Sequence, residues 1–182
     1  MGFSTHYLGR LDIIPPLNDA EVEWLCAFRE TERGFHPDDP YAVPMHPRAE
    51  VFEHPECALP GGGWVITAKP RVGLSRCDWE PCLQGCCLVW REVEKSNSAV
   101  EELAYLIDHF LRPGAHAQRD GRDDFAAFTF DHVVSGVIVA ERNDSRGLFL
   151  IVADNNALST QVLVPGDFLE RFGGRWDEDG ST

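Results

Sequence analysis

One segment, residues 98–114, constrains the fold more than any other part of the chain. Its apolar side chains recur at the spacing of a single helical face, and Pro113-Gly114 closes the pattern. Ser98 and Glu101 stand three residues apart, which is the spacing of a capping box in a first turn. The apolar face of this predicted helix consists of Val100, Leu103, Ala104, Ile107 and Leu111. Such a face needs a second layer of structure to cover it.

A second helix is predicted nearer the N-terminus, from Asp19 to Arg33. Asn18 and Glu21 form another capping box, and Gly34 lies where the helix would stop. Before it, residues 6–14 alternate between apolar and polar side chains, which is the period of a half-buried strand.

Much of the remaining chain has the pattern of strands joined by turns. Strands are predicted at residues 64–68, 74–79, 86–93, 125–134, 137–141, 148–152 and 161–164. As an alternative, residues 125–141 form one long bent strand. A short helix is predicted at 167–172. This order predicts an α+β fold, a mainly antiparallel sheet with two principal helices packed on one face. We expect Leu25, Leu103, Ile107 and Leu111 to be buried between the two layers.

The length predicts a single core. A chain of 182 residues can bury about 70% of the surface that its unfolded form exposes. We predict one α+β domain at residues 1–176 and an acidic tail at 177–182. Within the domain, residues 34–63 hold six of the twelve prolines and three of the seven histidines, so we predict an irregular excursion there.

The charge limits the classes of partner. Lysine and arginine number 16 against 30 aspartates and glutamates, which gives a net charge of −14. Such a charge opposes the phosphates of nucleic acids and anionic membranes. The longest apolar runs, 133–140 and 147–153, fall well short of the roughly 20 residues of a membrane span, and no targeting signal is evident. We expect a cytoplasmic protein that binds another protein, and a basic surface on that partner would complement the acidic charge. We expect no binding to nucleic acid or membrane.

The cysteines suggest one candidate metal site. Four of the six lie within eleven residues, at Cys77, Cys82, Cys86 and Cys87. The spacing of the first three is compatible with zinc, and His54 or Cys57 could complete the ligand set. In a strand over residues 86–93, Cys86 and Cys87 would face opposite sides, so only one of them could join Cys77 and Cys82.

Simpler explanations compete with that site. Cysteines in a strand also fill space as small hydrophobic residues, and a reducing cytosol does not favour three disulfides. We therefore expect no bound cofactor, with zinc as the alternative. A thiol nucleophile is another alternative, because His54, Glu56 and Cys57 lie together. The chain has no phosphate-binding loop, serine-nucleophile elbow or zinc-protease helix motif.

Two histidines outside the excursion have ordinary explanations. His109 and Asp108 fall on the polar flank of the second predicted helix, where a solvated face or a C-terminal cation is expected. His132 alternates with Phe128 and Phe130, which favours a histidine whose polar atoms are satisfied within the core.

Three short segments resemble a family of known sequences. They are Gly-Arg-Leu-Asp-Ile-Ile-Pro-Pro-Leu at 9–17, Cys-Asp-Trp-Glu-Pro at 77–81 and Leu-Ala-Tyr-Leu-Ile-Asp-His-Phe-Leu-Arg-Pro-Gly at 103–114. In these segments, and in the pair Asp154-Asn155, the chain is similar to an uncharacterised family of small acidic proteins from bacteria and their phages. The resemblance implies a shared fold and a link to mobile elements, and it implies no chemistry.

The sequence thus favours one function and leaves one alternative. The charge, the missing catalytic motifs and the resemblance favour an acidic accessory protein that acts by binding another protein, as a mobile-element effector or inhibitor. The alternative is a small cytosolic enzyme or a metal-binding protein that uses the Cys/His-rich middle of the chain.

Overall fold

The computed structural model describes residues 3–31, 41, 76–93 and 96–166. Its strands are β1 (Thr5–Ile14), β2 (Trp79–Pro81), β3 (Cys87–Trp90), β4 (Val133–Arg142), β5 (Leu148–Asp154) and β6 (Ala157–Val164). Its helices are α1 (Asp19–Glu30), α2 (Ala99–Leu106), the π-helical turn η3 (Ile107–Leu111), α3 (His116–Asp120) and the 3-10 turn η4 (Asp123–Phe125).

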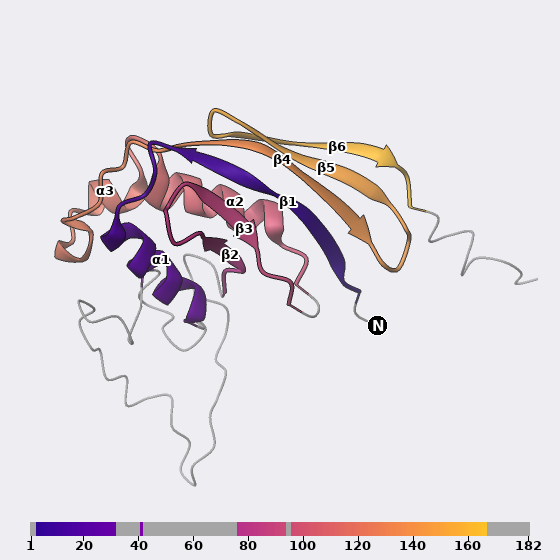
Figure 1. Cartoon of the computed structure of the whole chain (residues 1–182), viewed down its shortest axis with the longest axis horizontal. Coiled ribbons are helices and arrows are strands. Elements are labelled where there is room, and N and C mark those ends of the chain that lie inside the picture. The colour runs from indigo at the N-terminus through magenta and orange to yellow at the C-terminus, as the bar shows by residue number, and fades with distance from the viewer. Residues whose placement is uncertain (1–2, 32–40, 42–75, 94–95, 167–182) are drawn as a thin grey trace, which may run out of the picture.

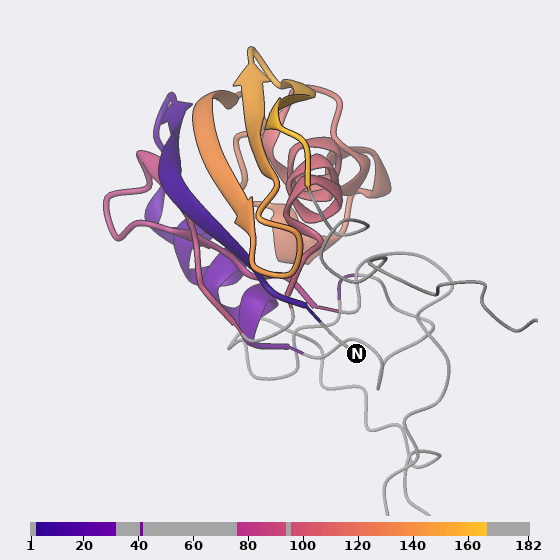
Figure 2. The ribbon, with the colours of Figure 1, turned by 90° about the vertical axis from the view of Figure 1, so that its right-hand side faces the viewer.

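The strands form one sheet in the order β2-β3-β1-β4-β5-β6, and every neighbouring pair is antiparallel. The α+β class is therefore confirmed. The helices lie on one side of the sheet, while the later part of β6 and the start of β1 extend past them (Figure 1). Figure 2 looks along the strands from that end and shows β1, β4 and β5 in their order across the sheet.

A single core lies between the sheet and the helices. Leu11 and Ile13 of β1 point into it, as does Ile138 of β4, and all three are at most 1% exposed. The four helix residues predicted to be buried, Leu25, Leu103, Ile107 and Leu111, are 0–3% exposed. The predicted packing of both helices against one face is confirmed, because these residues belong to the same buried cluster as the inward side chains of the sheet.

Helix α1 begins as its sequence predicts. The Asn18 side chain accepts a hydrogen bond from the Glu21 backbone N–H at 3.0 Å, and the Glu21 carboxylate accepts one from the Asn18 N–H at 2.8 Å. The helix ends at Glu30, where Thr31 has an extended backbone and caps it, so the predicted end at Arg33 was wrong.

The second predicted helix forms with two differences. It is α-helical only as far as Leu106 and continues as the π-helical turn η3, in which the Arg112 N–H bonds the Ile107 carbonyl. The capping box predicted at Ser98 was wrong, because the Ser98 backbone is not extended and its hydroxyl makes no cap.

Several predicted strand limits were wrong. The strand expected at 74–79 is β2, which starts only at Trp79, and the one expected at 86–93 is the shorter β3. The strand expected from residue 125 begins at Val133, because Phe130 adopts a positive φ of 52° and interrupts any extended run. From Val133, β4 runs without a break, and β6 begins earlier than predicted, at Ala157.

Other predictions concern residues outside the described part. They are the strand at 64–68, the helix at 167–172, nearly all of the excursion at 34–63 and the tail at 177–182, so the domain limits stay predictions. Among the described residues, no helix is both long and apolar enough to span a membrane.

Candidate functional site

The hairpin of β2 and β3 carries the most distinctive chemistry among the described residues. Its connecting turn runs from Cys82 to Cys86, and the Cys82 N–H closes it by donating to the Cys87 carbonyl at 3.0 Å. At the base of the hairpin, the Trp79 indole N–H donates to the Ala99 carbonyl of α2 at 2.8 Å. The hairpin is thus tied to the helical layer below it.

The turn is also held against the rest of the molecule. Gly85 has a φ of +67°, a left-handed conformation that glycine adopts without a steric penalty. Its carbonyl accepts from the Leu17 N–H at 3.0 Å, and the Cys86 carbonyl accepts from the Ile13 N–H at 2.9 Å. Because these hydrogen bonds fix the backbone between Cys82 and Cys87, the turn has a defined place in the fold.

Three thiols converge at this turn. The Sγ atoms of Cys82, Cys86 and Cys87 all lie within 4.8 Å of one another, and those of Cys82 and Cys86 are 3.5 Å apart. The prediction that only one of the adjacent cysteines could join Cys82 was wrong. Cys86 precedes the first residue of β3, so the alternation of a strand does not direct the two side chains to opposite faces.

The thiols differ in their pKa. Burial raises the pKa of Cys82, but hydrogen bonds from the thiols and backbone N–H groups of Cys87 and Cys86 outweigh it and lower this pKa to about 7. Burial, together with the hydrogen bond to Cys82, raises the pKa of Cys87 to about 11. Cys82 is therefore partly ionised near neutral pH, beside the neutral thiol of Cys87 that donates to it.

The spacing suits a single thiophilic ion. Thiolates bound to zinc at about 2.3 Å stand about 3.8–4.0 Å apart for tetrahedral or trigonal angles. The 3.5 Å between Cys82 and Cys86, and the 4.8 Å limit on the whole group, bracket that value. Cys86 is exposed and Cys87 is buried, so an ion here would lie at the surface with its inner side closed.

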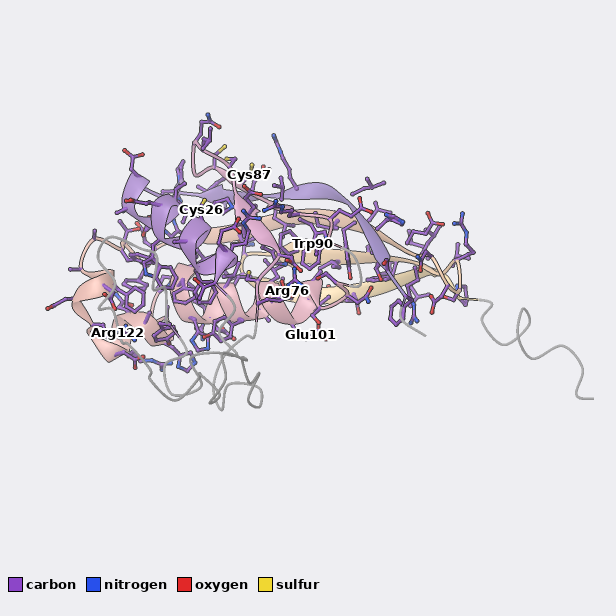
Figure 3. All side chains as sticks on the ribbon, turned by 90° about the horizontal axis from the view of Figure 1, so that it is seen from below. Cys26, Arg76, Cys87, Trp90, Glu101 and Arg122 are labelled. Atoms are coloured by element: carbon purple, nitrogen blue, oxygen red, sulfur yellow. The ribbon has the colours of Figure 1, made fainter. Side chains whose placement is uncertain are left out.

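The other predicted ligands divide into two groups. Cys77 does not belong to the cluster, because it is buried with its Sγ 3.9 Å from the Trp79 carbonyl oxygen. His54 and Cys57 lie outside the described residues. Cys26 is a separate, partly exposed thiol on α1, whereas Cys87 is on the hairpin (Figure 3).

His109 is part of a stack of rings. It stacks on Tyr105 at a centroid distance of 3.8 Å and on His116 at 4.4 Å, and its Nδ1 lies 2.8 Å from the Tyr41 hydroxyl. Burial, then the nearby His116, lowers the pKa of His109 to about 4. The expectation of a solvated or cationic His109 was therefore wrong, because the ring is packed and neutral.

His132 is a satisfied core residue, as expected. Its Nδ1 donates to the Pro15 carbonyl at 2.8 Å, and its Nε2 lies 3.1 Å from the Glu21 carboxylate. Burial alone would lower its pKa, but hydrogen bonds to Glu21 and to Pro15 raise it. Since the same carboxylate also accepts from the Thr129 N–H, this group ties α1 to the segment before β4 and presents no reactive atom to solvent.

The set Cys82, Cys86 and Cys87 was only partly foreseen. The predicted strands at 74–79 and 86–93 leave Cys82 in the connection between them. No signal in the sequence shows that the second strand starts at Cys87 and not at Cys86, which is what brings both adjacent cysteines to the same place. Comparison of the chain with protein-family models, curated proteins and solved structures found no match.

Proposed function

We propose that this chain is a metal-binding protein that holds a thiophilic ion, Zn(II), through Cys82, Cys86 and Cys87. The observation that supports the proposal is the convergence of three sulfur atoms within 4.8 Å on an anchored turn. A reducing cytosol, as expected for this chain, would keep these thiols available as ligands.

The electrostatics of the turn favour an ion. The thiolate form is the one that coordinates a metal, and the pKa of about 7 supplies one thiolate before any metal arrives. A divalent ion would draw the remaining protons off Cys86 and Cys87, since a coordinating thiol is deprotonated. Three protein ligands leave a fourth position for water, and exposed Cys86 puts that position at the surface.

The first experiment measures binding by the full chain. The reduced protein is freed of metal, incubated with zinc chloride, passed through a desalting column and analysed for zinc and protein. We expect one equivalent of zinc to remain bound. Cobalt chloride as a second probe should give the sulfur-to-cobalt charge-transfer absorption of thiolate coordination. A chelator should reverse both signals and lower the melting temperature to that of the metal-free protein.

Serine variants assign the ligands. Cys82→Ser, Cys86→Ser and Cys87→Ser should each lose stoichiometric zinc, and Cys26→Ser is the matched control that should keep it. Circular dichroism of each variant should match that of the parent chain if the variant is folded. Zinc content unchanged in Cys82→Ser and Cys87→Ser, or no zinc retained by the parent chain, would overturn the proposal.

A second proposed function, binding to another protein, is supported by a different surface. The outer face of the sheet exposes Leu8, Val137 and Val139 on neighbouring strands, at 70%, 47% and 40%. Grouped apolar side chains on a surface are a common mark of an interaction site. With a net charge of −14, the partner that fits is a protein with a basic rim around an apolar contact.

Salt and a single substitution test this second function. The association rate with such a partner should fall as added salt shortens the Debye length toward about 8 Å. Leu8→Asp should weaken the complex, whereas Glu23→Asp on an exposed position of α1 should not. A rate that does not respond to salt, or a complex unaffected by Leu8→Asp, would remove this surface from consideration.

A further inference from the structure

Strand β6 is an edge of the sheet that nothing among the described residues protects. It is last in the strand order, and β5 is its partner. Seven of its eight residues are exposed, and only Leu158 is partly buried. An edge strand presents unpaired backbone N–H and C=O groups, so proteins usually guard it with charges, proline or short length.

The residues of β6 supply none of these guards. From Ala157 to Val164 the strand contains no charged residue and no proline, in a chain of which 25% is charged. It is also the longer of the two edges of the described sheet, because the opposite edge, β2, has three residues and ends in Pro81. The single register shift against β5 lies near Leu148 and leaves the pairing of residues 157–161 regular.

An apolar hollow adjoins this edge. It has a volume of about 580 Å³, and Tyr7 of β1 and Phe149 of β5 form part of its wall. Val162 and Val164 of β6 also line it, although they are 67% and 47% exposed. A further strand beside β6 would extend the sheet over these side chains and remove their apolar surface from water.

We propose that β6 is a self-association edge at which a second copy of this chain pairs its own β6 antiparallel about a two-fold axis. The lack of charge on β6 favours the second copy as the occupant, because this strand offers a basic partner no acidic side chain and its own uncharged edge is the matching surface. Two molecules of net charge −14 repel each other over most surfaces, and the uncharged β6 is a place where they can meet without facing like charges. Antiparallel pairing is self-complementary, so the same strand serves both partners.

The experiment measures the mass of the full chain by sedimentation velocity from micromolar to submillimolar concentration. We expect the parent chain to shift from monomer to dimer over that range. The double variant Ser159→Lys/Gln161→Lys places two like charges at exposed positions of the edge and should remain monomeric. Its matched control, Asp12→Asn/Glu23→Gln, makes the same change in net charge on β1 and α1 and should dimerise as well as the parent or better.

Hydrogen exchange gives a second, backbone-level measurement. In the parent chain the amides of β6 should exchange more slowly as the concentration rises, while those of the exposed residues Asn143 and Arg146 between β4 and β5 should not change. A parent chain that is monomeric at every concentration would overturn the proposal, as would a dimer that survives both lysines. Binding of β6 to a different protein by an otherwise monomeric chain would also overturn it.

Discussion

The two edges of the sheet are built in opposite ways. The β2 edge is short, ends in a proline and has α1 and α2 packed against it, and its Trp79 is 1% exposed. The β6 edge is long, uncharged and open, and its Val162 is 67% exposed. The first edge is part of the core, and the second is a surface.

This difference teaches where each kind of function fits. The thiol turn needs sulfur atoms held within a fraction of an ångström, and the β2–β3 hairpin can hold them because Trp79 and Gly85 anchor it to α2 and to Leu17. Pairing with another strand needs unpaired backbone groups instead, and β6 has no second partner strand in the part of the chain that the structure describes. Each prediction below changes one side of this contrast.

The largest effect is expected at Trp79. Replacing it by alanine removes a fully buried ring and leaves the Ala99 carbonyl without its donor, so the free energy of unfolding should fall by about 3–5 kcal/mol. Trp90→Ala is the control, because its ring is only partly buried and its loss should have a smaller effect. Urea unfolding measures both, and equal losses would mean that the β2 edge is not part of the core.

A smaller loss is expected from Gly85→Ala. A Cβ on Gly85 would stand 2.3 Å from the Leu17 carbonyl oxygen and would clash with it. The left-handed backbone conformation adds an energy penalty of about 1–2 kcal/mol for an alanine. Gly121 also has a positive φ, of 62°, but nothing lies within 4 Å of its added Cβ, so Gly121→Ala should carry the backbone penalty alone. If the two variants unfold at the same urea concentration, the turn is not held against Leu17.

The tie between Glu21 and His132 should make stability depend on pH. The pKa of Glu21 is lowered from 4.5, so its contribution is full above that value and is lost as the pH falls. The pKa of His132 is raised from 6.5, so its contribution is full below that value and is lost as the pH rises through the raised pKa. The pair should stabilise α1 most between these two values.

Glu21→Gln tests that tie directly. The amide keeps the shape but loses the charge and one acceptor, so the free energy of unfolding near pH 5.5 should fall by about 1–3 kcal/mol. The losses of stability below pH 4.5 and above pH 6.5 should become smaller in the same variant. Glu23→Gln, on an exposed position of the same helix, is the control, and an equal response in both variants would contradict the assignment.

The sequence predicts elements better than it predicts their ends. The helical spacing of Leu103 and Ile107 predicts that they are buried, and the capping residues Asn18 and Glu21 predict the start of α1. Both signals are local in the sequence. The start of β3 is different, since the Cys86 carbonyl is bonded to the Ile13 N–H more than seventy residues earlier in the chain. That distant contact decides which cysteines converge, and local alternation cannot reveal it.

The aromatic residues before β4 give the same lesson. Phe128 and Phe130 alternate as in a strand, but in the structure the rings of Phe125 and Phe128 pack against Trp24 of α1, at centroid distances of 5.2 and 5.7 Å. Tertiary packing of large side chains overrides the local pattern here, so the strand begins only at Val133.

The smallest effect is expected at the open edge. Val162 is 67% exposed, so Val162→Ala should change the free energy of unfolding by less than about 0.5 kcal/mol at a concentration where the chain is monomeric. At high concentration the same variant should be less stable relative to the parent, because a dimer would cover this side chain and its removal would then cost buried apolar area. Ile151→Ala on the neighbouring strand is the control, because Ile151 is fully buried and should lose stability equally at both concentrations. A large loss for Val162→Ala in the monomer would show that this edge is already covered within one molecule, and the contrast between the two edges would disappear.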